Sequence, residues 1–217
     1  GPGAGPIAVA RKLRPYLPVP RVARDETAEG FAYRLDWDQP RSIGRVRSFF
    51  GNCGVLVRAY CYLLTHGPDG LRSVSENAVL NANYLRHALH REAEKAGISD
   101  MFIDGATTKV AKHEFTLSLL PAKEKYGISA MDVAKGLLDK GYMAPTVYFP
   151  LVVPECMMFE PTETESRDTL DKFAKEFIQV LQQDAETLHQ APITTPVRRV
   201  DEVYAARNLC LRHPFDE

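Results

Sequence analysis

Hydrophobic positions recur at helical spacing through the middle of the chain. Apolar residues three and four positions apart form one stripe, which predicts a helix that buries a single face: Leu71, Val74, Ala78, Ala82, Leu85 and Leu89. Gly97 follows as a residue that can end this helix in a left-handed conformation. The segment from Val55 to Leu64 is apolar on nearly all sides, which predicts a buried helix that ends at Gly67-Pro68.

The second half of the chain alternates between strand-like and helix-like patterns. Apolar and polar residues alternate over 114–119, the period of a half-buried strand. Ser129 and Asp132 have the spacing of a capping box, which predicts a helix that stops at Gly141. Short apolar strands are expected at 147–149 and 157–159, and a last helix is expected to begin near Ser166.

The order of these elements predicts the architecture from about residue 100 onward. Strand, helix, strand, strand and helix in succession indicate a small α+β domain, with helices on one face of a mainly antiparallel sheet. The first hundred residues offer a loop, extended segments and two helices, but no sheet for those helices to cover. We therefore expect a domain boundary between residues 1–98 and residues 99–217, the second part including a C-terminal tail.

Composition excludes several classes of protein. The chain has 217 residues, of which 45% are hydrophobic and 25% are charged, and a formal net charge of −1. Plentiful, evenly spread apolar residues exclude a disordered chain. A balanced charge lacks the general affinity for phosphate backbones of a basic nucleic-acid binder. No apolar run approaches the ~20 residues of a membrane span.

The four cysteines carry no metal-site or redox spacing. Cys53, Cys61, Cys156 and Cys210 include no C-x-x-C pair, and no cluster of cysteine and histidine that could hold zinc is present. Few cysteines over this length predict reduced thiols in a cytoplasmic protein.

Two glycine-containing segments are candidates for anion binding. The run GPGAGP at 1–6 could bring backbone N–H groups close to a phosphate, but it lacks the Lys and Ser/Thr of a P-loop, and a flexible terminus is the favoured alternative. The segment 51–54, GNCG, precedes a predicted helix, whose positive end could hold an anion. Ordinary capping by Asn52 is an equal and compatible alternative.

Three polar groups are candidates for catalytic or metal sites. His87, His90 and Glu94 have ligand-like spacing on a helix, but arginines flank them, which favours a solvated face. The pair His113-Glu114 could serve acid–base chemistry, although surface residues at a strand edge are the commoner case. The acidic segment 160–166 is accounted for by helix capping and the helix dipole. From residues alone, no catalytic triad or nucleophile elbow can be assembled.

Seven strings in the sequence carry a resemblance. They are GPGAGP (1–6), SIGRVRSFFGN (42–52), VLNANYL (79–85), HEF (113–115), APTVYFP (144–150), EPTETES (160–166) and TTPVRR (194–199). Together, in this order and spacing, they resemble the P-protein family, glycine dehydrogenase (decarboxylating), of the glycine cleavage system. The resemblance is to the C-terminal part of subunit 2 and extends from Gly1 almost to Glu217.

The resemblance implies a fold, a cofactor and partners. It implies the aspartate-aminotransferase-like α/β fold, with the trailing piece of the pyridoxal-phosphate-binding large domain at 1–98 and the small α+β domain at 99–217. In this family, glycine loses CO2 on pyridoxal phosphate, and the aminomethyl group passes to the lipoyl arm of H-protein. Subunit 1 and lipoylated H-protein are the implied partners, glycine is the implied substrate, and neither nucleic acid nor a membrane is expected.

The family's Schiff-base lysine has no counterpart in this sequence. In the family it lies immediately before the Gly-Pro-Gly string, and none of the ten lysines here matches that position, since Lys12 is the first. We therefore expect a fragment that has no catalytic residue of its own, binds no cofactor covalently and is inactive in isolation. Uncovered apolar faces at 55–64 and 71–89 lead us to expect that it self-associates.

The resemblance also implies where the candidate site residues lie. Gly1, Gly3 and Gly5 match the loop near the cofactor in the intact enzyme. The remaining candidates match strings that face the active-site cleft: Ser48, Gly51, Asn52, His113, Thr146, Glu160, Thr162 and Glu163. The family's Ala-Pro-His-Thr string is replaced by Ala-Pro-Ile-Thr at 191–194, so no tail histidine is carried over.

Two alternatives differ in class from this hypothesis. The chain could be a free-standing interaction or regulatory module derived from such a domain, which the coding region upstream of Gly1 would distinguish. An aminotransferase of the same fold is less favoured, because the strings at 42–52 and 160–166 are not general features of that fold.

Overall fold

A computed structural model describes residues 3–48, 51–105 and 110–212. The chain divides into two compact units, Gly1–Asp69 and Gly70–Glu217, and each is described by itself. This division falls before the boundary expected at residue 98, because the helix that precedes residue 98 packs on the sheet of the second unit. The expected boundary concerns the domains of a longer enzyme and stays a prediction.

The first unit contains a hairpin that the sequence pattern did not specify. A short 3-10 helix, η1 (Arg11–Tyr16), precedes strands β1 (Arg21–Thr27) and β2 (Gly30–Asp36). The strands pair antiparallel, from Arg21 opposite Asp36 to Thr27 opposite Gly30. Most of their side chains are exposed, so neither strand shows an alternation of buried and exposed positions.

Helix α1 (Cys53–Ala96) links the two units and changes direction at Gly67, whose φ of 61° is left-handed, just before Pro68. The predicted stop at Gly67-Pro68 is therefore a kink. The prediction that 55–64 is a buried helix is wrong for this chain: Leu64 is 65% exposed, because no described element covers that stretch. The expectation that the apolar face at 55–64 lacks cover agrees with this exposure. The same expectation for 71–89 is wrong in part, since Leu85 and Leu89 are buried.

The second unit is built on a four-stranded antiparallel sheet. Its strands are β3 (Ile103–Asp104), β4 (Phe115–Ser118), β5 (Thr146–Val147) and β6 (Cys156–Phe159). Their order in the sheet is β3-β4-β6-β5, and every pairing is antiparallel, as expected.

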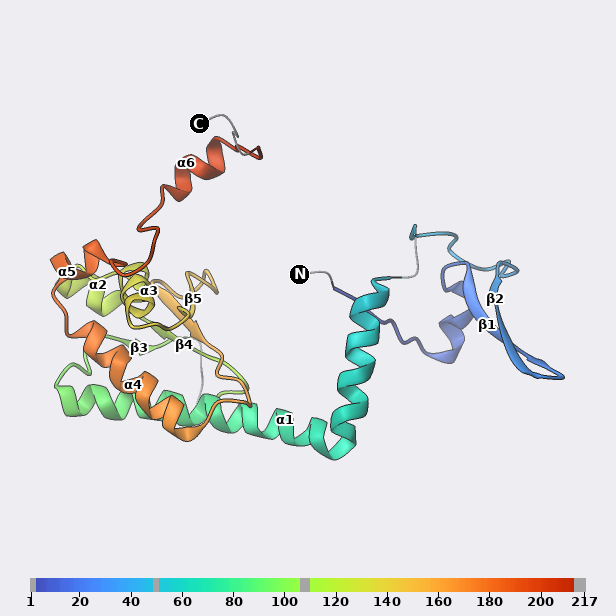
Figure 1. The fold of residues 1–217 in the computed structure, drawn as a ribbon, viewed down its shortest axis with the longest axis horizontal. Helices are drawn as coiled ribbons and strands as arrows, with labels where there is room; N and C mark the ends of the chain where they lie inside the picture. The colour runs from blue at the N-terminus through green and yellow to red at the C-terminus, as the bar shows by residue number, and fades with distance from the viewer. Residues whose placement is uncertain (1–2, 49–50, 106–109, 213–217) are drawn as a thin grey trace. The chain divides into compact units, whose positions relative to one another are not determined.

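Helices α2 (Leu120–Tyr126), α3 (Ala130–Asp139), α4 (Arg167–Leu181) and α5 (Ala185–Gln190) complete the second unit, and α6 (Glu202–Arg207) lies in the exposed tail. One face of the sheet joins the helices in a single core, where the rings of Phe115 and Phe159 stack 5.0 Å apart. Helix α4 packs across the second part of α1, and the Tyr84 hydroxyl donates to Asp171 at 2.8 Å (Figure 1). The α+β layer prediction is confirmed.

The other face of the sheet is covered by a loop, which corrects one expectation. Strand β4 was expected to be half-buried, but all four of its residues are buried. The Ser118 hydroxyl donates to the Pro154 carbonyl at 2.7 Å, so the loop 148–155 shields the positions that alternate with the core. Ser118, one of the polar residues that alternate with apolar ones in β4, therefore binds the loop and is not exposed to solvent.

The predicted helix ends at Ser129, Gly97 and Ser166 are confirmed. Asp132 accepts from the Ser129 amide at 2.9 Å, and the Ser129 hydroxyl accepts from the Asp132 amide at 3.2 Å, which forms the capping box of α3. Gly97 has a φ of 71° after the last residue of α1. Ser166 caps α4 by accepting from the Thr169 amide at 3.2 Å.

Two side chains fasten the tail to the second unit. Asp139, at the end of α3, accepts from the amides of Ile193 and Thr194, each at 2.8 Å. Arg199 donates to Asp132 at 2.7 Å and to the Ala191 carbonyl at 2.8 Å. Among the described residues, no helix is both long and apolar enough to cross a lipid bilayer.

Candidate functional site

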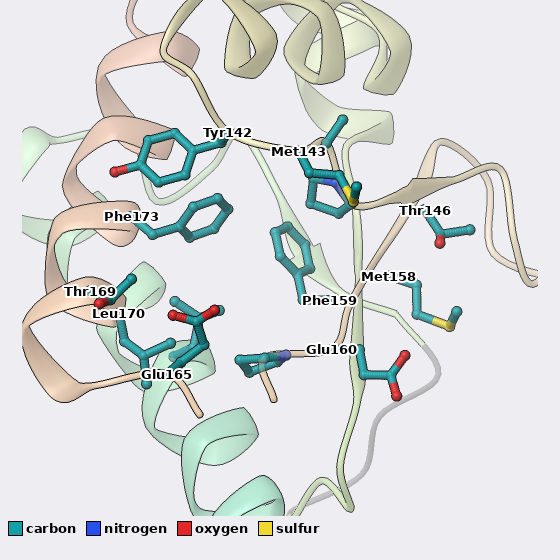
Figure 2. A pocket seen from close by; sticks show the side chains of 14 residues that line it. Tyr142, Met143, Thr146, Met158, Phe159, Glu160, Glu165, Thr169, Leu170 and Phe173 are labelled. Atoms are coloured by element: carbon teal, nitrogen blue, oxygen red, sulfur yellow. The ribbon is translucent and has the colours of Figure 1, made fainter. Parts of the chain in front are cut away.

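A groove of about 370 Å³ opens on the second unit between the β5–β6 edge of the sheet and α4 (Figure 2). Two of the predicted cleft residues, Thr146 and Glu160, line it. Its walls are mostly apolar and include Leu85, Tyr142, Met143, Pro145, Phe159, Pro161, Leu170 and Phe173. A mostly apolar hollow with a few polar groups is the usual form of a ligand site.

Aromatic rings fix the floor of this groove. Tyr142 and Phe173 meet edge to face with centroids 5.2 Å apart, and Phe159 meets Phe173 in the same way at 6.2 Å. The only charged residues in the lining are Glu160 and Glu165. Figure 2 shows the Glu165 carboxylate pointing toward the aromatic rings, while Glu160 points away on the other side of Phe159.

His113 does not line the groove itself but lies beside Glu160, which does. Its Nε2 lies 3.8 Å from an oxygen of Glu160 and 3.8 Å from an oxygen of Glu114. The sheet register explains this proximity, because Phe115 pairs with Phe159 and the two strands end side by side. His113 is 53% exposed and Glu160 is 59% exposed, so solvent screens the pair, and the structure favours the surface interpretation of His113-Glu114.

Thr162 and Glu163 lie on the loop beyond Glu160 but outside the lining of the groove. The Thr162 hydroxyl lies 2.7 Å from that of Thr164, and Glu163 is half-buried. This loop ends at Ser166, which caps α4 as predicted.

Two asparagines of α1 hold the loops that carry these candidates. Asn81 donates through Nδ2 to the carbonyls of Thr162, at 2.8 Å, and Glu165, at 3.1 Å. Asn83 accepts from the Ala111 amide and donates to the Ala111 carbonyl, both at 2.9 Å. Sequence reasoning did not select either residue, because they are two positions apart, point to different sides of the helix and form no pattern on one face.

The histidine-bearing face of α1 forms an ion-pair cluster. Arg86 binds Asp104 through both Nε and Nη2, and His90 Nε2 lies 3.1 Å from the same carboxylate. Burial alone would raise the pKa of Asp104, but the hydrogen bonds from Arg86 and His90 outweigh it and hold the pKa below its usual value. His87 is exposed, and the described residues contain no group of three or more potential metal ligands.

The candidates of the first unit are partly brought together. The side-chain amide of Asn52 donates to the Gly3 carbonyl at 2.6 Å, so the segments 1–6 and 42–52 are in contact. Asn52 directly precedes α1, and its carbonyl accepts from the Leu56 amide at 3.0 Å, the first bond of the helix. Gly51 has a left-handed φ of 106°, and Ser48 is exposed.

A pyridoxal phosphate site is not complete within the described residues. Gly1 lies outside them, and a Cβ added to Gly3 or Gly5 would meet nothing within 4 Å. Both glycines are exposed, so nothing described encloses a phosphate there. The residues present do not fit the cofactor by themselves.

Comparison with known proteins identifies the lineage. Residues 74–199 match the family model "Glycine dehydrogenase, C-terminal domain". Probable glycine dehydrogenase (decarboxylating) subunit 2 of Chlorobium phaeovibrioides is 48% identical over 98% of this chain and 43% of its own length. That of Halalkalibacterium halodurans is 50% identical over 98% of this chain and 41% of its own. The chain thus spans less than half the length of these relatives.

A solved structure shows the same fold. The crystal structure of glycine decarboxylase (P-protein) of the glycine cleavage system, in inhibitor-bound form, matches with a TM-score of 0.61 at 19% identity, covering 78% of this chain and 37% of that one. The expectation of a pyridoxal-phosphate-enzyme fold with an α+β C-terminal part is confirmed. Both comparisons agree with the strings in the sequence, and the chain belongs to the family of glycine dehydrogenase (decarboxylating) subunit 2, whose C-terminal domain it contains.

Proposed function

We propose that the chain is the C-terminal part of a pyridoxal-phosphate-dependent glycine decarboxylase of the glycine cleavage system. The enzyme releases CO2 from glycine and passes the aminomethyl group to the lipoyl arm of H-protein, acting together with subunit 1. The observation that carries this proposal is the identity of 48–50% to subunit 2 proteins over 98% of the chain.

The second unit contributes a surface of the active-site cleft in this proposal. Thr146 and Glu160 line the groove, and His113 lies beside Glu160. Such residues bind and orient the reactants and exclude water. Asn81 and Asn83 fix the two loops to α1, because the side-chain amide of each binds main-chain atoms of one loop. Thr162, Glu163, Ser48, Gly51 and Asn52 stay candidates for the same cleft.

The cofactor, in this proposal, binds to the intact enzyme and not covalently to this chain. None of the ten lysines matches the family's cofactor-binding lysine, so the isolated chain is inactive. Incubation with pyridoxal phosphate should give no visible absorbance band that borohydride abolishes. We place the enzyme in the cytoplasm, in keeping with four free cysteines.

A domain exchange tests the proposed activity. In the subunit 2 of a relative such as that of Halalkalibacterium halodurans, the corresponding region is replaced by this chain. The hybrid is combined with subunit 1 and lipoylated H-protein, and exchange of labelled bicarbonate into glycine is measured. We expect activity within about tenfold of the relative's, and none for the isolated chain.

Two controls separate misfolding from a lack of activity. The melting temperature and the pyridoxal phosphate absorbance of the hybrid show whether it folds and binds cofactor. A hybrid that does both but exchanges no bicarbonate would contradict the proposal and favour a non-catalytic module.

A further inference from the structure

Three arginines line a hollow in the first unit. The hollow has a volume of about 340 Å³ and lies between the η1 segment and the loop after β2. Its lining consists of Arg14, Pro15, Arg21, Gln39, Pro40 and Arg41, without a carboxylate. In a chain whose net charge is −1, three guanidinium groups around one hollow are a marked local excess of positive charge.

Contacts within the unit orient these guanidinium groups without neutralising all of them. Arg21 donates through Nη1 to the Arg14 carbonyl at 3.2 Å. Arg41 lies over the ring of Tyr16, with its guanidinium carbon 5.6 Å from the ring centre. The carboxylate of Asp36 accepts from the side-chain amide of Gln39 at 2.6 Å and lies 3.6 Å from Arg34. Asp36 also pairs with Arg21 across the hairpin and offsets part of the positive charge of that guanidinium group.

Arg21 keeps one unsatisfied donor. Its Nε is buried and has no hydrogen-bond partner among the described residues. A buried N–H without an acceptor costs free energy, and a charged group costs more than a neutral one. Because this nitrogen is buried, a ligand in the open hollow does not reach it directly, but an oxyanion there would offset the mutual repulsion of the arginines beside it.

We propose that this hollow binds the phosphoryl group of a small phosphomonoester. Guanidinium groups match the geometry of phosphate oxygens. A phosphate dianion also neutralises more of the three positive charges than a singly charged carboxylate does. The volume lies within the range of small-molecule sites and exceeds what a bare phosphate fills, which leaves room for an organic part. The proposal goes beyond glycine cleavage, and its test needs no catalysis.

The test is an NMR titration of the 217-residue chain. The Nε–H signal of Arg21, assigned from Arg21→Lys, is followed while inorganic phosphate, glycerol phosphate, acetate or chloride is added. We expect glycerol phosphate to shift this signal and to bind at least about tenfold more tightly than acetate or chloride. Arg41→Gln, on an exposed loop, should weaken binding about tenfold.

Arg24→Gln is the matched control. Arg24 is an exposed arginine of β1 whose guanidinium carbon lies 5.3 Å from the ring centre of Phe31, and it does not line the hollow. Its replacement should leave the affinity unchanged. The proposal is overturned if chloride or acetate binds as tightly as the phosphates, if Arg41→Gln has no effect, or if Arg24→Gln weakens binding as much. Tighter binding of inorganic phosphate than of glycerol phosphate would overturn the phosphomonoester assignment.

Discussion

Asp132 is the residue whose replacement we expect to be most informative about the second unit. Its buried carboxylate accepts from the Ser129 amide at 2.9 Å and from the Ser129 hydroxyl at 2.5 Å. It also accepts from Arg199 at 2.7 Å, so one side chain both caps α3 and anchors the tail. Asp132→Asn keeps the shape of the side chain but removes its charge.

The magnitude follows from these contacts. The oxygen that Asn keeps can still accept from Ser129, but these bonds are no longer charge-assisted, which costs about 1 kcal/mol. The bond to Arg199 is charge-assisted and would be worth about 1.5–3 kcal/mol when buried, but Arg199 is 36% exposed, so we discount it to about 1 kcal/mol. The variant should therefore lose about 2 kcal/mol of unfolding free energy at neutral pH.

The loss should depend on pH with a definite sign. Burial by itself would raise the pKa of Asp132, but the hydrogen bonds from Ser129 and Arg199 hold the pKa below its usual value. A lowered pKa in the folded state gives stability that is present above the unfolded pKa of about 3.9 and is lost as pH falls through the folded pKa. The difference between wild type and Asp132→Asn should therefore shrink below about pH 4.

Urea unfolding followed by far-UV circular dichroism measures this difference at each pH. Trp37 is the only tryptophan and lies in the first unit. The unfolding midpoint followed by its fluorescence should therefore be the same for the variant and the wild type. Asp100→Asn, which removes an exposed partner of Lys125, is a control with a much smaller expected effect. An equal loss for both variants, or a loss that does not change with pH, would refute the reasoning.

Three further predictions concern packing and association. Gly136→Ala should destabilise by about 1 kcal/mol in urea unfolding, because the added Cβ would lie 2.7 Å from Val180 and overpacking outweighs the helix-propensity gain; unchanged or raised stability would contradict this. Asn83→Ala should cost about 2 kcal/mol in the same assay, since it breaks two hydrogen bonds to Ala111. Sedimentation velocity should show concentration-dependent self-association that Leu64→Gln weakens, because Leu64 is 65% exposed; a monomer at every concentration would argue against it.

Features set by neighbouring residues were predictable from the sequence. The capping box of α3 needs only Ser129 and Asp132, three positions apart, and the end of α1 needs only a glycine at 97. The hairpin β1–β2 was missed although Phe31, Tyr33 and Leu35 recur at every second position of β2. Strand β1 carries no such pattern, and the side chains of both strands are mostly exposed. Burial of 55–64 was mispredicted because composition records apolar side chains but not what covers them.

The candidate site depended on contacts that no local pattern contains. Resemblance selected His113 and Glu160, but their proximity follows from the register that pairs Phe115 with Phe159. The groove itself combines the β5–β6 edge with Phe173 of α4, elements far apart in the chain. The arginine hollow was likewise not predicted, since Arg14, Arg21 and Arg41 come together only through the hairpin and its flanking loops.

The second part of α1 has a consequence for how this sequence can vary by insertion and deletion. Within two turns, Asn81, Asn83, Tyr84 and Arg86 each bind a different segment: the 162–165 loop, Ala111, α4 and β3. One inserted residue would rotate everything after it by about 100°. Several long-range contacts would then be lost at once. Substitutions can be tolerated there one at a time, whereas a change in length in homologous sequences should be confined to the connecting loops.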